Sequence, residues 1–156
     1  MMAATQTVWR IITRRFAGQA FSGEGARLYG GRWNKVGQSV IYTAASRSLA
    51  LLEMMVQDES SRAHYVLIPG YLPSSVSIEE LDINTLPQGW RTHAGRQVLQ
   101  SIGMEWLRES RSCVLAVPSS VVPAELNFLI NPTHPDFQYV KLGEPETLDT
   151  DMRLYP

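Results

Sequence analysis

The sequence of 156 residues contains a single cysteine, Cys113. One cysteine cannot form an internal disulfide, and it excludes a zinc site built on several cysteines. Cys113 lies in the apolar run 112–117, which predicts a small buried hydrophobic side chain in preference to a reactive thiol. The histidines show no metal-ligand spacing, so we expect no metal site.

Long apolar runs and a targeting segment are also missing. The longest apolar runs are about eight residues, against the ~20 that a membrane-spanning helix needs. Residues 1–6 have neither the basic start nor the apolar core of a signal peptide. We therefore expect a cytoplasmic protein that does not engage a membrane.

The sequence has little net charge, with a formal value of -1, and it has no tract of lysine and arginine. This balance disfavours a nucleic-acid-cleaving function, because binding to a phosphate backbone requires a basic surface. An apolar fraction of 44% and a charged fraction of 19% are typical of a compact globular protein. No repeat or linker divides the chain, so we expect one domain over residues 1–156.

Two nucleotide-binding motifs are absent. No Gly-x-Gly-x-x-Gly follows a strand, and there is no Gly-Lys-Ser/Thr, so neither a Rossmann redox site nor a nucleotide triphosphatase is supported. If this protein binds a dinucleotide, we expect it to be consumed as a substrate and no cofactor to be needed.

Short apolar segments separated by glycine and proline predict the secondary structure. Ser46 is a plausible N-cap for a helix, Pro69-Gly70 is expected to end a strand, and Gly103 is expected to interrupt a helical stretch. Strands are expected over 7–12, 39–43, 64–69, 76–78, 113–117 and 139–142, helices over 46–57 and 91–101, and a long ordered loop over 17–31.

The segment Gly30-Gly31-Arg32-Trp33-Asn34 is the centre of the predicted site. Two glycines allow close approach of the backbone to a ligand, and a guanidinium, a large ring and a carboxamide follow at once. Tyr42 lies ten residues beyond Arg32, and Glu53 eleven beyond Tyr42. We expect Arg32, Tyr42 and Glu53 to converge on one small-molecule site.

Glu53 is the strongest single candidate. It is the only polar residue in the helical run from Leu49 to Val56, so no polar face is available to carry it. Desolvation of a carboxylate is costly unless the group is paired or used in function. The alternative is a buried structural ion pair, with Arg32 itself as a candidate partner.

Three further residues are weaker candidates for nucleotide binding. Arg27 is either a solvated loop charge or a second anion contact. Ser119 follows a buried strand, where a hydroxyl either faces a pocket or caps local backbone. Asn131 begins the Asn-Pro-Thr-His-Pro segment, whose X-Pro steps predict a rigid turn in which His134 has a structural role.

These residue types fit one kind of substrate. Arginine binds phosphate through a permanently charged fork, and a tyrosine ring stacks on a flat heteroaromatic. A lone carboxylate stabilises the positive charge that develops at an anomeric carbon during glycoside cleavage. NAD+ combines a diphosphate, ribose and a cationic aromatic leaving group, although residue types alone leave other nucleotides and sugars open.

The chain resembles the RES-domain toxins of bacterial type II toxin–antitoxin systems. The resemblance rests on several segments in the family's order and spacing, among which Met152 replaces an expected proline: Trp9-Arg10, Gly30 to Asn34, Tyr42-Thr43-Ala44, Leu51-Leu52-Glu53, Val117-Pro118-Ser119, Asn131 to Phe137, and Asp151 to Leu154.

The resemblance implies an α+β, ADP-ribosyltransferase-like domain, with small mixed or antiparallel sheets and flanking helices around an NAD cleft. It places the family's Arg, Glu and Ser on Arg32, Glu53 and Ser119, and its active-site tyrosine on Tyr42. The implied roles are phosphate or ribose binding by Arg32, nicotinamide stacking by Tyr42, stabilisation of the oxocarbenium by Glu53, and a hydrogen bond from Ser119 to ribose or Glu53.

The implied function is a toxin that cleaves NAD+ at the nicotinamide–ribose bond and so arrests growth. The implied partner is an antitoxin with an Xre-like helix-turn-helix domain that blocks the cleft, so nucleic acid is contacted only through the antitoxin. The family also implies a homodimer within a larger complex. Two alternatives stay open, namely a protein ADP-ribosyltransferase using the same site and a non-catalytic nucleotide-binding module.

Overall fold

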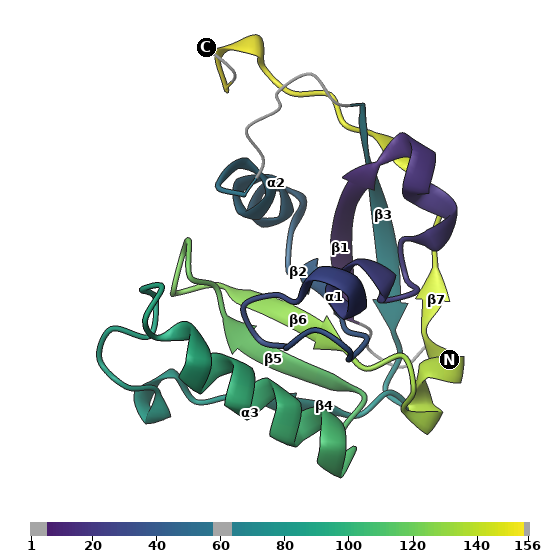
Figure 1. Cartoon of the computed structure of the whole chain (residues 1–156). Helices are drawn as coiled ribbons and strands as arrows, with labels where there is room; N and C mark the ends of the chain where they lie inside the picture. Colours follow the sequence, from purple (N-terminus) through teal and green to yellow (C-terminus); the bar gives the residue numbers. More distant parts are fainter. Residues whose placement is uncertain (1–5, 58–63, 155–156) are drawn as a thin grey trace.

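The computed structural model describes residues 6–57 and 64–154. Within these ranges one mixed sheet of eight strands runs through the fold in the order β4-β5-β6-β2-β1-β3-β7, with β8 also paired to β3 (Figure 1). Neighbouring strands are antiparallel except β4 and β5, which are parallel. The strands are β1 Gln6–Thr13, β2 Ile41–Ala44, β3 Tyr65–Leu72, β4 Ile78–Glu80, β5 Val114–Pro118, β6 Leu126–Ile130, β7 Lys141–Leu142 and β8 Glu146–Thr147.

The sheet divides into two halves at the junction of β1 and β2. These strands share one register pair, Trp9 with Ala44, whereas β1 pairs with β3 along its whole length. The half formed by β4, β5, β6 and β2 is turned steeply against the half formed by β1, β3 and β7 (Figure 1). The strong bend leaves room for a cleft where the halves meet.

Helix α2, Arg47–Met55, covers the junction. The Ser46 hydroxyl accepts a hydrogen bond from the backbone N–H of Leu49 at 3.1 Å, so the predicted N-cap is confirmed. Leu49 and Ala50 pack against Trp9, Ala44 and Leu67 of the sheet. The buried contacts fix the face of α2 that carries Glu53.

Helix α3, Arg96–Glu109, packs on the other half of the sheet. Its Leu99 and Trp106 join a core cluster with Leu115 and Leu129. The predicted interruption at Gly103 is wrong, because the helix runs through this residue without a break. A Cβ on Gly103 would lie 1.8 Å from the carbonyl oxygen of Trp33, so the glycine allows the segment 30–34 to press against the helix.

The start of α3 also differs from the prediction. The helix begins at Arg96, five residues after the expected Arg91, because residues 89–95 form turns closed by hydrogen bonds to Gly89 and Thr92. A Cβ on Gly95 would lie 2.5 Å from the Gly89 carbonyl oxygen, so this glycine permits the turn to fold back on itself. The turn therefore sets the position of Arg96.

Two further predictions are corrected. The expected loop over 17–31 contains a 3-10 helix, Arg14–Gln19, and helix α1, Glu24–Tyr29, which lies between Gly23 and Gly30, both with positive φ. The third strand continues through Pro69-Gly70 to Leu72. Pro69 still accepts a hydrogen bond from the Gly143 N–H, and Gly70 leaves room for Val8 and Phe21.

The second core lies on the opposite face of the sheet and contains Val8, Ile41, Ile68 and Phe128. Cys113 is fully buried in it, as predicted, and burial raises the pKa of its thiol to about 12. The α+β fold with a mixed, mostly antiparallel sheet and flanking helices is thus confirmed, although the strands join in one bent sheet. In the part of the chain that the structure describes, no helix is both long and apolar enough to cross a membrane.

Candidate active site

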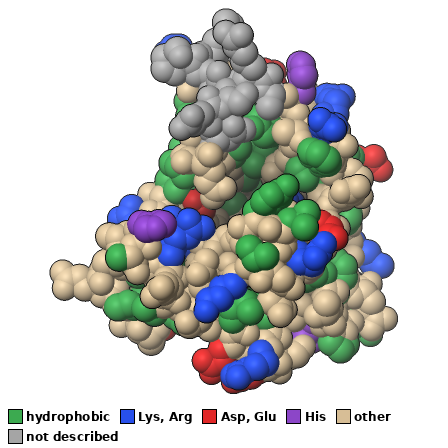
Figure 2. All heavy atoms as spheres, in the orientation of Figure 1, with side chains coloured by type: hydrophobic (Ala, Val, Ile, Leu, Met, Phe, Trp, Pro, Cys, Tyr) green, Lys and Arg blue, Asp and Glu red, His purple; other side chains and the backbone are tan. Residues whose placement is uncertain are grey.

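A cleft of about 1050 Å³ opens where the two halves of the sheet meet. Its walls come from α2 on one side and from the segment 25–33 on the other, with Tyr42, Asn127 and Leu129 of β2 and β6 between them. Figure 2 shows the hollow, with hydrophobic side chains in its depth and basic and acidic side chains at one edge. Its size is at the upper end of small-molecule sites and suits a dinucleotide.

The segment Gly30 to Asn34 is held rigidly. The Gln100 side chain on α3 donates a hydrogen bond to the Gly31 carbonyl oxygen at 2.9 Å. Asn34 is fully buried, and its amide nitrogen donates to three backbone carbonyl oxygens, those of Ala26, Lys35 and Gln38. A loop fixed in this way presents Arg32 at a defined place.

Tyr42 completes this anchoring. Its hydroxyl donates to Asn34 Oδ1 at 2.6 Å and accepts from the Trp33 backbone N–H at 3.0 Å. A Cβ on Gly31 would lie 2.6 Å from the Tyr42 hydroxyl, so the second glycine of the motif gives this hydroxyl its place. Burial raises the pKa of Tyr42 above its usual value, which keeps the phenol protonated as a donor.

Glu53 faces the cleft from α2 and is held by Asn127. The Asn127 amide nitrogen donates a hydrogen bond to Glu53 Oε2. Burial raises the pKa of Glu53 above 4.5, and the hydrogen bond from Asn127 and the charge of Arg32 oppose that rise. Within the described ranges Glu53 forms no direct ion pair with Arg32, so the structural-pair alternative is not what the geometry shows.

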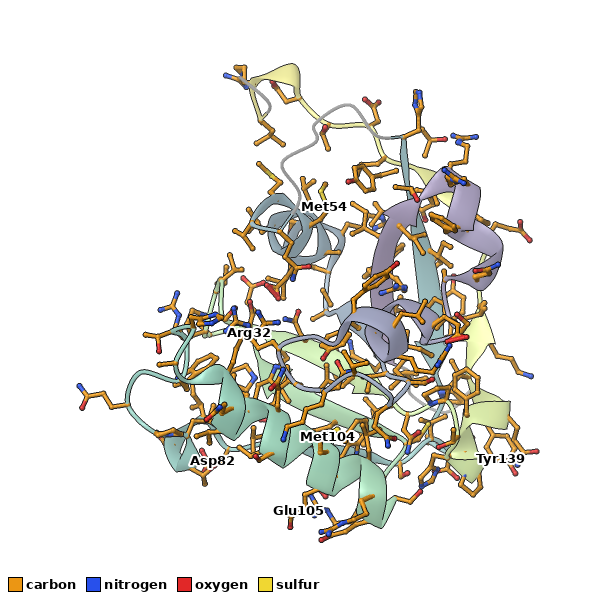
Figure 3. All side chains as sticks on the ribbon, in the orientation of Figure 1. Arg32, Met54, Asp82, Met104, Glu105 and Tyr139 are labelled. Carbon is orange, nitrogen blue, oxygen red and sulfur yellow. The ribbon has the colours of Figure 1, made fainter. Side chains whose placement is uncertain are left out.

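Arg32 lies between α2 and the first turns of α3 (Figure 3). Its Nη1 is 3.5 Å from the carbonyl oxygen of Arg91, to which it donates a weak hydrogen bond. Burial and the neighbouring charge of Arg96 lower the pKa of Arg32. Arg10 and Arg96 also line the cleft, while Glu53 is the one acidic residue among the lining residues that the structure describes. The cleft is therefore cationic on balance.

The structure brings together Arg32, Tyr42 and Glu53, but it leaves the other candidates outside the cleft lining. Ser119 is fully buried, and its hydroxyl accepts hydrogen bonds from the N–H groups of Val121 and Val122. Its neighbour Ser120 lines the cleft instead. Arg27 is exposed and paired with Glu24 on α1. The geometry thus gives Ser119 a turn-forming contact and Arg27 a surface one.

Asn131 also lies outside the cleft lining. It is buried, and its Oδ1 accepts hydrogen bonds from the N–H and the hydroxyl of Thr133. His134 accepts from the Asp136 N–H, and Asp136 accepts in turn from the Ser77 hydroxyl and N–H. These hydrogen bonds make the segment after β6 a rigid turn, in which His134 has the structural role that was predicted.

Sequence reasoning missed Asn127 as a site residue, and this carboxamide occupies the position beside Glu53. The signal was available, because Asn127 is the one polar residue in the strand Leu126–Ile130, as Glu53 is in its helix. Its Oδ1 is buried and has no hydrogen-bond partner among the described residues. A buried carbonyl oxygen without a donor is energetically unfavourable, so Asn127 breaks the pattern of its strand in its hydrogen bonding as well as in its polarity.

No group of three potential metal ligands occurs among the described residues. The site instead combines one desolvated carboxylate, unpaired guanidinium groups and an aromatic wall. Such a set is typical of a catalytic cleft for an anionic, ring-containing ligand.

Comparison with known proteins assigns the family. The model of the RES domain matches residues 7–151, and the chain belongs to the RES-domain family. It is 37% identical over 150 residues to a protein named Toxin Res from Photorhabdus laumondii, covering 94% of this chain and 96% of that protein. It is 40% identical over 143 residues to the Prs ADP-ribosylating toxin of a Sphingobium strain, covering 88% and 89%.

The fold has a solved counterpart. The crystal structure of the M. tuberculosis MbcT-MbcA toxin–antitoxin complex contains a chain that superposes with a TM-score of 0.78 at 18% identity, covering 94% of this chain and 86% of that one. At this identity the likeness supports the shared fold.

Proposed function

We propose that this protein is the toxin of a toxin–antitoxin system and that it cleaves NAD+ at the nicotinamide–ribose bond. The observation that carries the proposal is the carboxylate of Glu53, the one acidic group among the described lining residues, which is desolvated in a cleft that otherwise presents arginines and an aromatic wall. The Photorhabdus relative is named as a toxin and the Sphingobium relative as an ADP-ribosylating toxin, and both names support the proposal.

Cleavage of this bond requires a negatively charged group close to the ribose anomeric carbon. The bond between the nicotinamide nitrogen and the ribose anomeric carbon breaks, and its electron pair leaves with nicotinamide. The ribose is left with oxocarbenium character, which a nearby carboxylate stabilises. Asn127 holds Glu53 through one oxygen, Oε2, which leaves the other free to face the ribose. An acceptor then bonds to the anomeric carbon.

The charge of the cleft fits the whole substrate. The positive charges of Arg10, Arg32 and Arg96 attract the diphosphate, and Tyr42 offers a ring for nicotinamide stacking. NAD+ enters as a substrate in this scheme, and no separate cofactor takes part. The acceptor is water or phosphate in the leading proposal.

A second candidate function is transfer of ADP-ribose to a protein. The same cleft and the same bond cleavage serve it, and the relative named as an ADP-ribosylating toxin favours it. The two functions differ only in what occupies the opposite side of the anomeric carbon.

We further propose a cytoplasmic complex with an antitoxin that carries an Xre-like helix-turn-helix domain and covers the cleft, with two toxin copies in the assembly. Exposed apolar side chains support a protein partner at the cleft mouth: Tyr29 is 83% exposed and Val56 is 65% exposed, and both line the cleft. Contact with DNA would then be made by the antitoxin.

The test follows the ADP-ribose product. Protein freed of antitoxin is incubated with NAD+ labelled in its adenine ring, with and without inorganic phosphate and with cell extract, and the products are identified by mass spectrometry. Free or phosphorylated ADP-ribose supports the leading function. Label retained on protein supports the second. Intact NAD+ in every arm, with folded protein, contradicts both.

A further inference from the structure

Two neighbouring guanidinium groups line one side of the cleft. Arg32 comes from the segment Gly30 to Asn34, and Arg96 is the first residue of α3. They are close enough that the charge of Arg96 lowers the pKa of Arg32. Two like charges held together in a partly desolvated place destabilise each other unless an anion lies between them.

The charge of Glu53 acts on Arg32, but neither arginine is ion-paired with a carboxylate in the part of the chain that the structure describes. Among residues 6–57 and 64–154, Arg32 and Arg96 form no ion pair, whereas Arg27, Arg47, Arg111 and Arg153 each pair with a carboxylate. The Nε atom of Arg96 is buried and has no hydrogen-bond partner in the same ranges. A buried guanidinium donor without a partner is costly, and a bound anion would satisfy it.

The backbone around the start of α3 fixes the position of Arg96. Gly95 lets the turn 89–95 close tightly, and Trp90 of that turn is buried against the α3 core. Arg91, in the same turn, donates from Nε to the Ser120 carbonyl oxygen at 2.8 Å. Its own carbonyl oxygen is the acceptor for Arg32. The turn therefore positions both guanidinium groups.

We propose that Arg96 binds a phosphate group of the substrate, bridging it with Arg32, and that this contact makes the cleft select phosphate-bearing nicotinamide nucleotides over nicotinamide riboside. The inference rests on the proposed function for the identity of the substrate, but the phosphate site itself does not depend on cleavage. A planar fork with several N–H donors matches a phosphate group better than a single ammonium does.

The first arm of the test measures binding with ADP as the probe and adenosine as its phosphate-free match. Arg96→Gln should weaken ADP binding tenfold or more in calorimetry and leave any adenosine binding unchanged. The ADP affinity of Arg96→Lys should lie between those of wild type and Arg96→Gln. Arg108→Gln, at the far end of the same helix and largely exposed, removes the same charge and should behave as wild type. Unchanged ADP affinity in Arg96→Gln, or no ADP binding to wild-type protein, overturns the proposal.

The second arm measures turnover of NAD+, nicotinamide mononucleotide and nicotinamide riboside. For the two phosphate-bearing substrates Arg96→Gln should raise KM about tenfold or more with kcat changed less than about threefold. For nicotinamide riboside kcat/KM should stay within about twofold of wild type. An equal loss on all three substrates indicates a structural role and overturns the proposal.

The two arms separate the two proposals. Arg96-dependent ADP binding in a protein that leaves NAD+ intact supports the phosphate site and contradicts the proposed function. If Arg96→Gln cleaves NAD+ as the wild type does and binds ADP with unchanged affinity, the proposed function is supported and the phosphate site is contradicted. Thermal melting of each variant confirms that it is folded.

Discussion

The amide nitrogen of Asn127 donates a hydrogen bond to Oε2 of Glu53. The two residues are 74 positions apart in the chain, one near the start of strand β6 and the other on the helix that covers the junction of the sheet. This contact opposes the effect of burial on Glu53 and keeps the carboxylate ionised more readily than burial alone would.

Replacing Asn127 with leucine should therefore impair the reaction most strongly at low pH. The pKa of Glu53 lies above its usual value, and loss of the hydrogen bond raises it further, so the acid limb of the kcat/KM profile should move to higher pH. At neutral pH kcat/KM should fall about 10- to 100-fold, the equivalent of a charge-assisted hydrogen bond of about 1.5–3 kcal/mol. Asn84→Leu, on an exposed turn, is the control, and an acid limb that does not move contradicts the assignment.

Glu53→Gln should be more stable than wild type while losing activity. A carboxyl group whose pKa is raised on folding stabilises the folded state below its unfolded pKa and loses that contribution as pH rises through the folded value. The Tm of Glu53→Gln should exceed that of wild type at pH 7, and the difference should shrink in acid. Thermal melts at several pH values measure the difference in Tm between the variant and wild type. A difference that favours the variant less at pH 7 than at pH 4 would contradict this prediction.

Tyr42→Phe separates the ring from the hydroxyl. The ring can still face the ligand, but Asn34 Oδ1 and the Trp33 N–H lose their partner. We expect a loss of about 1–3 kcal/mol in the free energy of unfolding, because both groups are then left unsatisfied. Denaturant unfolding measures the loss, and kinetics at low temperature should show a raised KM for NAD+ as the segment 30–34 loosens. Unchanged stability indicates that the hydroxyl does not anchor that segment.

Gly103→Ala should destabilise the protein and the site together. The added methyl group would meet the Trp33 carbonyl oxygen, so α3 and the segment 30–34 must move apart. Overpacking of this kind costs about 1–3 kcal/mol, or roughly 3–10 °C in Tm for a domain of this size. Gly18→Ala is the matched control, since a Cβ there has open space. Equal Tm values for the two variants contradict the close-approach explanation.

The sequence was most informative where a residue broke its local pattern. Glu53 in an apolar helix and the run Gly30 to Asn34 both led to the cleft, and Ser46 marked the start of α2 correctly. Gly103 was misread, because a glycine that permits a close contact looks in sequence like one that ends a helix. Only the fold shows what a glycine touches.

The sequence marks Asn127 as unusual in its strand, but it does not show which residues come together with Arg32 and Glu53. Asn127, Arg96 and Arg10 are distant in sequence from Arg32 and Glu53, and they meet in the cleft because the sheet bends at the pair Trp9 and Ala44. The register of one strand decides which of its side chains face the cleft, and that register depends on the whole sheet. Ser119 and Asn131 are candidates that the fold leaves outside the cleft lining, since their side-chain oxygens accept hydrogen bonds within their own turns.

The most direct test measures nicotinamide released from NAD+ by purified, antitoxin-free protein beside Glu53→Gln. Wild-type protein should release nicotinamide, and the variant should release it about 100- to 1000-fold more slowly, the usual cost of removing one group that stabilises transition-state charge. Release by Glu53→Gln at the wild-type rate, or no release by folded wild-type protein, would contradict the assignment of Glu53 and the proposed cleavage of NAD+.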